Sequence, residues 1–200
     1  MFHVEQIPQH VQVMAVTKGR TLEEIKLVLE HHNVKLIGES RWQEAKTKLP
    51  HLPKEIAKHF IGHVQTNKLK EIMANFDCIE SVDSIKLLEK IDALAEALHV
   101  KYPIFLQINI SSDPNKYGFT VDELPKIVEQ CQKMFHVELL GLMAITAKQT
   151  IDQSRKDFKQ LKQLQQTYQL KELSMGMSTD YNVAIEEGAT IIRIGKALFN

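Results

Sequence analysis

Residues 171–195 read KELSMGMSTDYNVAIEEGATIIRIG and contain one complete strand–helix–strand unit. Short apolar or β-branched runs near 171–176 and 190–195 have the length and composition of buried strands. Between them lies a turn of small and hydroxyl residues, followed by a short helix that we expect to begin near Thr179. A strand, a crossover helix and a second strand form the repeating unit of a parallel sheet, so this stretch predicts the fold class.

The same alternation of strand and helix runs along the whole chain. Helical periodicity and Thr or Asp caps mark the segments TLEEIKLVLEHHN, DSIKLLEKIDALAEALHV, TVDELPKIVEQCQKMF and DQSRKDFKQLKQLQQTYQ. The eight predicted strands lie near residues 11–16, 35–39, 58–62, 78–81, 103–110, 139–145, 171–176 and 190–195.

Eight βα units favour an α/β fold with a single closed (β/α)8 barrel, of the TIM type, over residues 1–200. A doubly wound open sheet uses the same alternation and remains the alternative. No linker or low-complexity stretch divides the chain, and its length leaves little room for a second domain.

Composition narrows the possible partners. Lys and Arg together number 25, as do Asp and Glu, so no net charge attracts nucleic acid or an anionic membrane. The first residues lack a signal-peptide pattern, no apolar run is long enough to cross a bilayer, and we therefore expect a cytoplasmic protein. Cys78 and Cys131 lie outside any metal-binding or disulfide pattern and are expected to be buried thiols.

Polar residues follow the predicted strands, where the chemistry of a parallel barrel is found. Lys18 follows the first strand, in VMAVTKGR. In a pocket of low dielectric constant the pKa of a lysine falls from about 10.4, which makes the amine nucleophilic and able to form an imine. A solvated lysine at a strand end is the alternative.

The stretch 171–195 adds an anion site and a buried cation. Ser178 can cap the short helix, whose amides and dipole favour phosphate, and Gly195 allows the backbone to approach an anion closely. An ordinary capped helix is the alternative. Arg193 within TIIRIG needs a hydrogen-bond partner, either an acceptor on a ligand or Glu39 across the barrel mouth. His63 is interpreted as a wall of the pocket, and a zinc site with His59 is not favoured.

An amine, an anion site and a buried arginine at one barrel mouth suit pyridoxal 5′-phosphate (PLP), the vitamin B6 cofactor. The blocks AVTKGR, IGESRWQEA, HFIGHVQTNK, ESVDSIKLLEKI, NISSDPNKYGF, GLMAI and LSMGMSTDYNVAIEEGATIIRIG together resemble the PLP homeostasis proteins. The resemblance runs in order over nearly the whole chain. It implies a barrel of the alanine racemase N-terminal type without the second β domain, and PLP held as a Schiff base.

The resemblance also implies a role for individual residues. The lysine of AVTK, Lys18, would carry the Schiff base, and Arg193 would face the pyridine nitrogen. The other predicted cofactor contacts are Ser178 and Gly195 at the phosphate, Asn109 and Met143 at the ring, and Ser174 near the phosphate loop. No metal ligand and no catalytic residue is predicted.

The chain departs from the family pattern at two places. It reads GES where the family usually has GEN, which puts Ser40 in place of an asparagine. Family members usually carry a helix before the first strand, which this chain reaches within about ten residues. We expect either a truncated start or a barrel base that is covered differently.

The implied function is PLP homeostasis, in which a monomer stores, buffers or delivers PLP, with apo PLP enzymes as recipients and little catalysis of its own. An amino-acid racemase or decarboxylase using the same Schiff base is one alternative. A cofactor-free aldolase, in which Lys18 attacks a sugar phosphate, is another.

Overall fold

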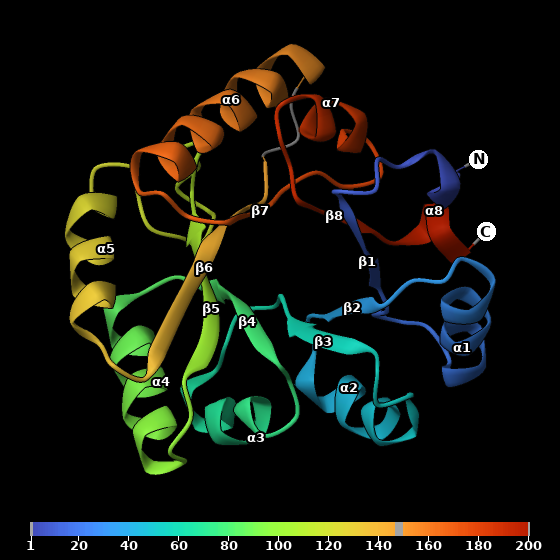
Figure 1. The fold of residues 1–200 in the computed structure, drawn as a ribbon, viewed down its shortest axis with the longest axis horizontal. Helices are drawn as coiled ribbons and strands as arrows, with labels where there is room; N and C mark the ends of the chain where they lie inside the picture. Colours follow the sequence, from blue (N-terminus) through green and yellow to red (C-terminus); the bar gives the residue numbers. More distant parts are fainter. Residues whose placement is uncertain (1, 147–149, 200) are drawn as a thin grey trace.

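The computed structural model describes residues 2–146 and 150–199 and contains a closed barrel of parallel strands. Each strand pairs with the next one along the chain, and β8 closes the barrel on β1 (Figure 1). The strands are β1 (Gln12–Val16), β2 (Leu36–Glu39), β3 (Ala57–Phe60), β4 (Cys78–Val82), β5 (Tyr102–Ile108), β6 (Val137–Ala144), β7 (Glu172–Ser174) and β8 (Ile191–Ile194). The predicted barrel and all eight predicted strands are confirmed, and the open-sheet alternative is wrong.

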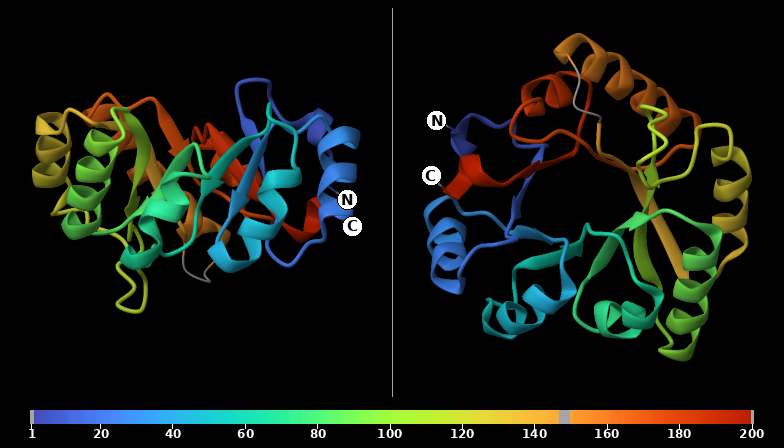
Figure 2. Two further views of the ribbon diagram at one scale, coloured as in Figure 1. Left: turned by 90° about the horizontal axis from the view of Figure 1, so that it is seen from below. Right: turned by 180° about the vertical axis from the view of Figure 1, so that it is seen from behind.

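Helices surround the barrel on its outer side, as both views in Figure 2 show. The helices are α1 (Leu22–His31), α2 (Trp42–Lys48), α3 (Leu69–Met73), α4 (Ile85–Ala97), α5 (Leu124–Lys133), α6 (Ile151–Thr167), α7 (Tyr181–Glu186) and α8 (Lys196–Phe199), with short 3-10 turns at Val4–Gln6, Leu49–His51 and Thr66–Lys68. Local sequence sets their starts: Thr21 and Glu24 form a reciprocal capping box at α1. None of the helices in the described ranges is long and apolar enough to cross a membrane.

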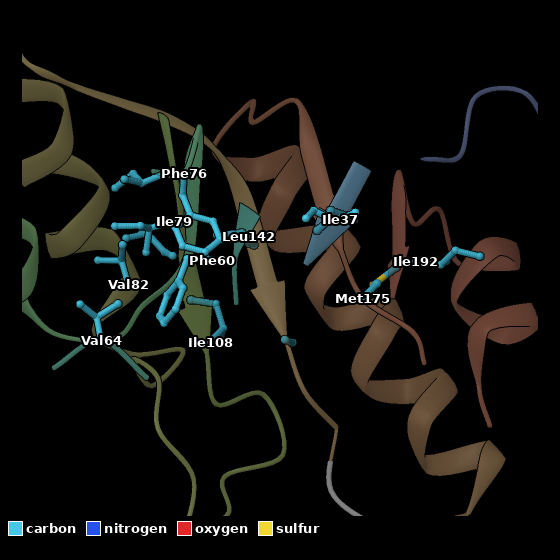
Figure 3. Packing of buried hydrophobic residues seen from close by; sticks show 14 of the residues in the cluster. Ile37, Phe60, Val64, Phe76, Ile79, Val82, Ile108, Leu142, Met175 and Ile192 are labelled. Carbon is cyan, nitrogen blue, oxygen red and sulfur yellow. The ribbon is translucent and has the colours of Figure 1, made fainter. Parts of the chain in front are cut away.

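The strands divide the core into an inner and an outer layer because successive side chains point to opposite faces. A small cluster fills the barrel and consists of Met14, Leu36, Cys78, Phe105, Met143 and Ile191. A larger cluster packs the outer face of the strands against the helices. Figure 3 shows part of it, with Phe60, Val64, Phe76, Ile79 and Val82 gathered together. The direction in which each strand residue points therefore decides which layer it joins.

The two ends of the barrel differ. Because all strands are parallel, their carboxyl ends meet at one mouth, and their amino ends meet at the base. A cavity of about 810 Å³ lies at the base, and residues 7–9 and 11–13 of the N-terminal segment line it together with His59. The short 3-10 turn at Val4–Gln6 and the residues after it thus border the base in this chain.

Candidate functional site

Lys18 lies at the mouth of the barrel, just beyond β1. Met14 of the same strand points into the barrel interior, and Thr17 points outward to Glu39. Lys18 follows at the strand end, and its side chain is exposed. Gly19 then turns the chain with φ +71°, a conformation that a side chain disfavours. The predicted position at the mouth is confirmed, and the exposed side chain matches the alternative of a solvated strand-end lysine rather than a lysine in a low-dielectric pocket.

A buried ionic cluster holds the backbone on both sides of Lys18. We call it the outer cluster, and it consists of Thr17, Glu39, Glu44 and Lys48. Lys48 Nζ lies 2.7 Å from Glu39 Oε1 and donates to the Thr17 carbonyl at 3.0 Å. Thr17 Oγ1 donates to the same Glu39 oxygen at 2.6 Å. The amide of Gly19 donates to Glu44, which also pairs with Lys48 at 3.0 Å.

The charges of the outer cluster affect Glu44 directly. Partial burial opposes ionisation of its carboxyl, but hydrogen bonds from the Gly19 amide and from Lys48 outweigh burial, so the pKa of Glu44 lies below its usual range. Residues 17 and 19 are therefore tied to β2 and α2, and the exposed side chain of Lys18 projects from an anchored stretch of backbone.

A second buried polar group lies inside the barrel. We call it the inner network, and it consists of His59, Glu80, Ser174 and Arg193. Arg193 Nη1 donates to Ser174 Oγ at 2.8 Å, and Nη2 donates to the Ala144 carbonyl at 2.7 Å. Ser174 Oγ donates to Glu80 Oε2 at 2.5 Å, and Glu80 Oε1 lies 2.7 Å from His59 Nδ1. Burial lowers the pKa of Arg193, and the charges of Glu80 and Asp180 oppose that shift.

The inner network excludes one of the two partners that the sequence allowed for Arg193. Arg193 does not pair with Glu39, because Gly38 faces Met14 in the barrel interior and Glu39, the next residue, points to the outer layer. Ser174 ends β7 directly before that loop, and its hydroxyl lies within the barrel between Arg193 and Glu80.

The loop after β7 differs from the predicted helix cap. The helix α7 begins at Tyr181 rather than near Thr179, and its N-cap residue is Asp180. Buried Asp180 accepts hydrogen bonds from the Met177 amide at 2.7 Å and from Thr146 Oγ1 at 3.0 Å, which closes the loop. Ser178 is exposed and does not cap α7, so that prediction is wrong.

The loop nevertheless offers donors to an anion. Within the described ranges, the amides of Ser178 and Thr179 make no hydrogen bond to protein atoms. Gly195 follows β8, and within the described residues a Cβ placed on it would meet Val16 alone, at the ordinary contact distance of 3.9 Å. The backbone of this glycine is therefore little obstructed beside the end of β1, next to the segment that carries Lys18.

Asn109 and Met143, predicted at the ring of the cofactor, occupy different depths. Asn109 is half-buried at the end of β5, where Nδ2 donates to the Asp113 carbonyl at 2.8 Å and orders the following loop. Met143 is fully buried in the small cluster inside the barrel. Asn109 therefore lies at the mouth, whereas Met143 supports the floor below it.

Three further side chains at the mouth were not predicted as a group. The rings of His63 and Tyr117 stack with centroids 4.1 Å apart, and His63 Nδ1 lies 2.9 Å from Asp83 Oδ2. Lys116 Nζ donates to the Ile145 carbonyl at 3.1 Å, and burial lowers the pKa of its amine. Lys116 and Tyr117 belong to the block NISSDPNKYGF, and both lie beyond the fifth predicted strand in a stretch without a periodic signal.

The groups at the mouth fit the chemistry of PLP. Lys18 presents a primary amine, and the loop amides with Gly195 present anion donors. Among the described residues, Arg193 donates from Nη1 to Ser174 and from Nη2 to the Ala144 carbonyl, and a guanidinium has five N–H donors, so donors remain for an acceptor on a ring. An aldehyde, a ring nitrogen and a phosphate are the complementary groups of PLP.

Comparison with known proteins places the chain in a family. The profile of the alanine racemase N-terminal domain matches residues 3–200. A pyridoxal phosphate homeostasis protein of Synechocystis is 38% identical over 203 residues, which cover 96% of this chain and 92% of that protein.

Solved structures support the same assignment. PipY of Synechococcus elongatus, solved without PLP, is 35% identical with a TM-score of 0.91, and the match covers 98% of this chain and 95% of that one. PipY solved with PLP bound is 34% identical, with a TM-score of 0.87 and the same coverage. Clostridium difficile alanine racemase shares the fold at 15% identity and a TM-score of 0.75, over 98% of this chain and 53% of the racemase. The chain therefore belongs to the pyridoxal phosphate homeostasis protein family, whose barrel is that of the alanine racemase N-terminal domain.

Proposed function

We propose that this protein binds PLP at the barrel mouth, holds it through Lys18 and serves PLP homeostasis by storing, buffering or delivering it. The observation that carries the proposal is the exposed side chain of Lys18 on an anchored strand end, next to Gly195, with the buried guanidinium of Arg193 inside the same barrel. The name of the family and the PLP-bound structure of PipY support it.

Each predicted residue has a part in this proposal. PLP supplies an aldehyde, which condenses with an amine and releases one water molecule. Lys18 is the amine, Arg193 donates to the ring nitrogen, and Ser178 with Gly195 binds the phosphate. Asn109 borders the ring at the mouth and Met143 supports the ring from below. Ser174 acts through Arg193 rather than on the phosphate.

The exposure of Lys18 favours a carrier over an enzyme. Incoming water or an acceptor can reach an exposed linkage, which release of a carried cofactor requires. Racemisation, by contrast, needs an acid or base on each face of the cofactor ring. A guanidinium such as Arg193 only donates hydrogen bonds, so the ring nitrogen stays unprotonated and is a weaker electron sink. We infer that racemase or decarboxylase activity is absent or slow.

Delivery to apo PLP enzymes is the use that we propose for the carried cofactor. Holo-protein should activate an apoenzyme faster than spontaneous loss of PLP from the holo-protein allows. Amino-acid turnover near the enzymatic median of about 10 per second would instead support the racemase alternative. A cytoplasmic location stays a prediction.

The covalent assignment is tested by absorbance and mass analysis. Purified protein loaded with PLP should show a visible absorbance band that borohydride abolishes, and the reduced mass should map to the peptide containing Lys18. Lys18→Ala should lose the band while keeping the fold, because an exposed strand-end side chain contributes little packing. Lys133→Ala, on the outer helix α5, is the matched control and should keep it.

Two outcomes separate the alternatives. Reduced mass on the peptide containing Lys116, a second lysine whose contacts place it at the mouth, would overturn the assignment to Lys18. A protein that gains no visible band with PLP, yet is reduced onto Lys18 in the presence of a sugar phosphate, would favour the cofactor-free aldolase.

A further inference from the structure

Glu80 is a fully buried carboxylate to which the proposed function gives no part. It lies on β4, two residues after Cys78, which belongs to the cluster inside the barrel, so Glu80 points inward as well. An ionised carboxylate in a barrel core is costly unless other groups neutralise it and donate hydrogen bonds to it. The described contacts of Glu80 are His59 and Ser174, from strands β3 and β7.

The direction of these hydrogen bonds links Glu80 to Arg193. Ser174 has one hydroxyl hydrogen, which it donates to Glu80 Oε2 at 2.5 Å. The lone pairs of Ser174 Oγ are then available to Arg193 Nη1, which donates to this oxygen at 2.8 Å. If the acceptor on Glu80 were lost, the hydroxyl could rotate and the guanidinium would lose a fixed partner on that side.

The second contact of Arg193 cannot replace this link. Nη2 donates to the Ala144 carbonyl at 2.7 Å, and one contact leaves the guanidinium plane free to turn about it. Two contacts on different nitrogens fix both the position and the plane. The connection between β4 and β7 crosses the barrel, since β5 and β6 separate these strands in the sheet.

We propose that Glu80 is a positioning residue which acts through Ser174 to fix the plane of the Arg193 guanidinium against the ring nitrogen of the cofactor. The inference rests on the proposed function, because it concerns the same site and the same ligand. It assigns to Glu80 and Ser174 the control of the electronic state of the ring, while Lys18 and the loop amides hold the cofactor. A residue that served stability alone would not affect the ring nitrogen.

The first test uses the protein without PLP. Exchange of the Arg193 guanidinium hydrogens with water, followed by NMR, should be slow in the parent protein. Glu80→Gln and Ser174→Ala should each accelerate it about tenfold, the equivalent of one hydrogen bond of about 1.4 kcal/mol. The double variant should be no faster than Ser174→Ala alone, because Glu80 acts through the serine. Additive effects, or no acceleration, would overturn the proposal.

The second test uses protein loaded with PLP labelled with 15N in the ring. Glu80→Gln and Ser174→Ala should shift the 15N resonance, since the donor at the ring nitrogen is displaced. Glu129→Gln is the control, because this carboxylate lies on the outer helix α5, where it pairs with Lys133 and has no part in the proposed site. A resonance that moves equally in all three variants, or in none, contradicts a positioning role for Glu80.

The failures of the two proposals are distinguishable. Borohydride labelling of Lys18 in the parent protein is measured first, and its absence would reject the proposed function while the exchange measurement still tests the link to Arg193. Labelling of Lys18 together with an unchanged 15N resonance in Glu80→Gln would reject only the positioning role. Ser174→Ala removes a single hydroxyl, so it keeps the test available if Glu80→Gln fails to fold.

Discussion

Glu39 and Glu80 are both almost completely buried, yet they serve opposite sides of the barrel wall. Glu39 points outward, where Lys48 and Thr17 hold it in the outer cluster. Glu80 points inward, where it accepts from Ser174 in the inner network. The outer cluster fixes a segment of backbone, namely the turn that carries Lys18, whereas the inner network fixes a side chain, the guanidinium of Arg193.

The contrast between Glu39 and Glu80 shows that the direction in which a strand residue points, outward or inward, decides which functional group its buried charge can support. A shift of one residue along a strand exchanges the two faces. Polar pairs that look equivalent in sequence can therefore belong to different layers. The comparison predicts separable effects: variants of the outer cluster change stability and the reactivity of Lys18, and variants of the inner network change the environment of Arg193.

The largest effect is expected for Lys48→Met. The variant leaves Glu39 buried without its cation and should lower the free energy of unfolding by about 3–5 kcal/mol. It should also slow the attachment of PLP to Lys18, since Lys48 holds the Thr17 carbonyl. Urea denaturation and the growth of the visible band measure the two effects. Lys68→Met, which removes a surface pair with Glu71, should leave both unchanged.

Ser178→Ala tests the phosphate site, which belongs to neither cluster. Loss of one hydrogen bond to a charged group should weaken PLP retention by about 1–2 kcal/mol, and inorganic phosphate should compete with PLP. Dialysis against increasing phosphate measures retention. Equal retention of PLP and of phosphate-free pyridoxal would contradict a phosphate site in this loop.

The smallest effect concerns the pH dependence of the outer cluster. Because the pKa of Glu44 is lowered in the folded protein, its contribution to stability is present above its ordinary value of 4.5 and is lost as the pH falls through the lowered pKa. Partial exposure limits this contribution to less than about 1 kcal/mol. The parent protein and Glu44→Gln should therefore differ in unfolding free energy at pH 7 and converge at acidic pH. If the difference in unfolding free energy stayed constant with pH, ionisation of Glu44 would not be the source of the pH dependence.

Much of the fold was predictable because short apolar runs and helical periodicity mark each βα unit independently. The location of Lys18 and Gly195 at the mouth was also predictable, since parallel strands end at one edge. The fold and the position of these two residues follow from the order of strands and helices along the chain alone. The exposure of Lys18 was not predictable, because it depends on which loops cover the mouth.

The partners of the buried charges required three-dimensional information. A pair between Arg193 and Glu39 would need Glu39 to point into the barrel. Gly38 faces Met14 in the interior, so Glu39, the next residue, points outward. A usable signal did exist for Glu80: the predicted strand CIES puts Cys78 and Glu80 on one face, and a charged residue beside a buried cysteine is unusual. The sequence analysis assigned the cap of the short helix to Ser178. The sequence does not show that Asp180 accepts a hydrogen bond from the Met177 amide, which closes the loop and moves the start of the helix to Tyr181.

A crystal structure of the protein loaded with PLP is the sharpest test of Lys18 as the attachment point. We expect continuous density from Lys18 Nζ to the cofactor, Arg193 at the ring nitrogen, and the phosphate against the amide of Ser178 beside Gly195. We also expect Glu80 and Ser174 to keep the contacts described above. PLP attached to another lysine, or bound in the cavity at the base of the barrel, would show that Lys18 and the mouth are not the binding site.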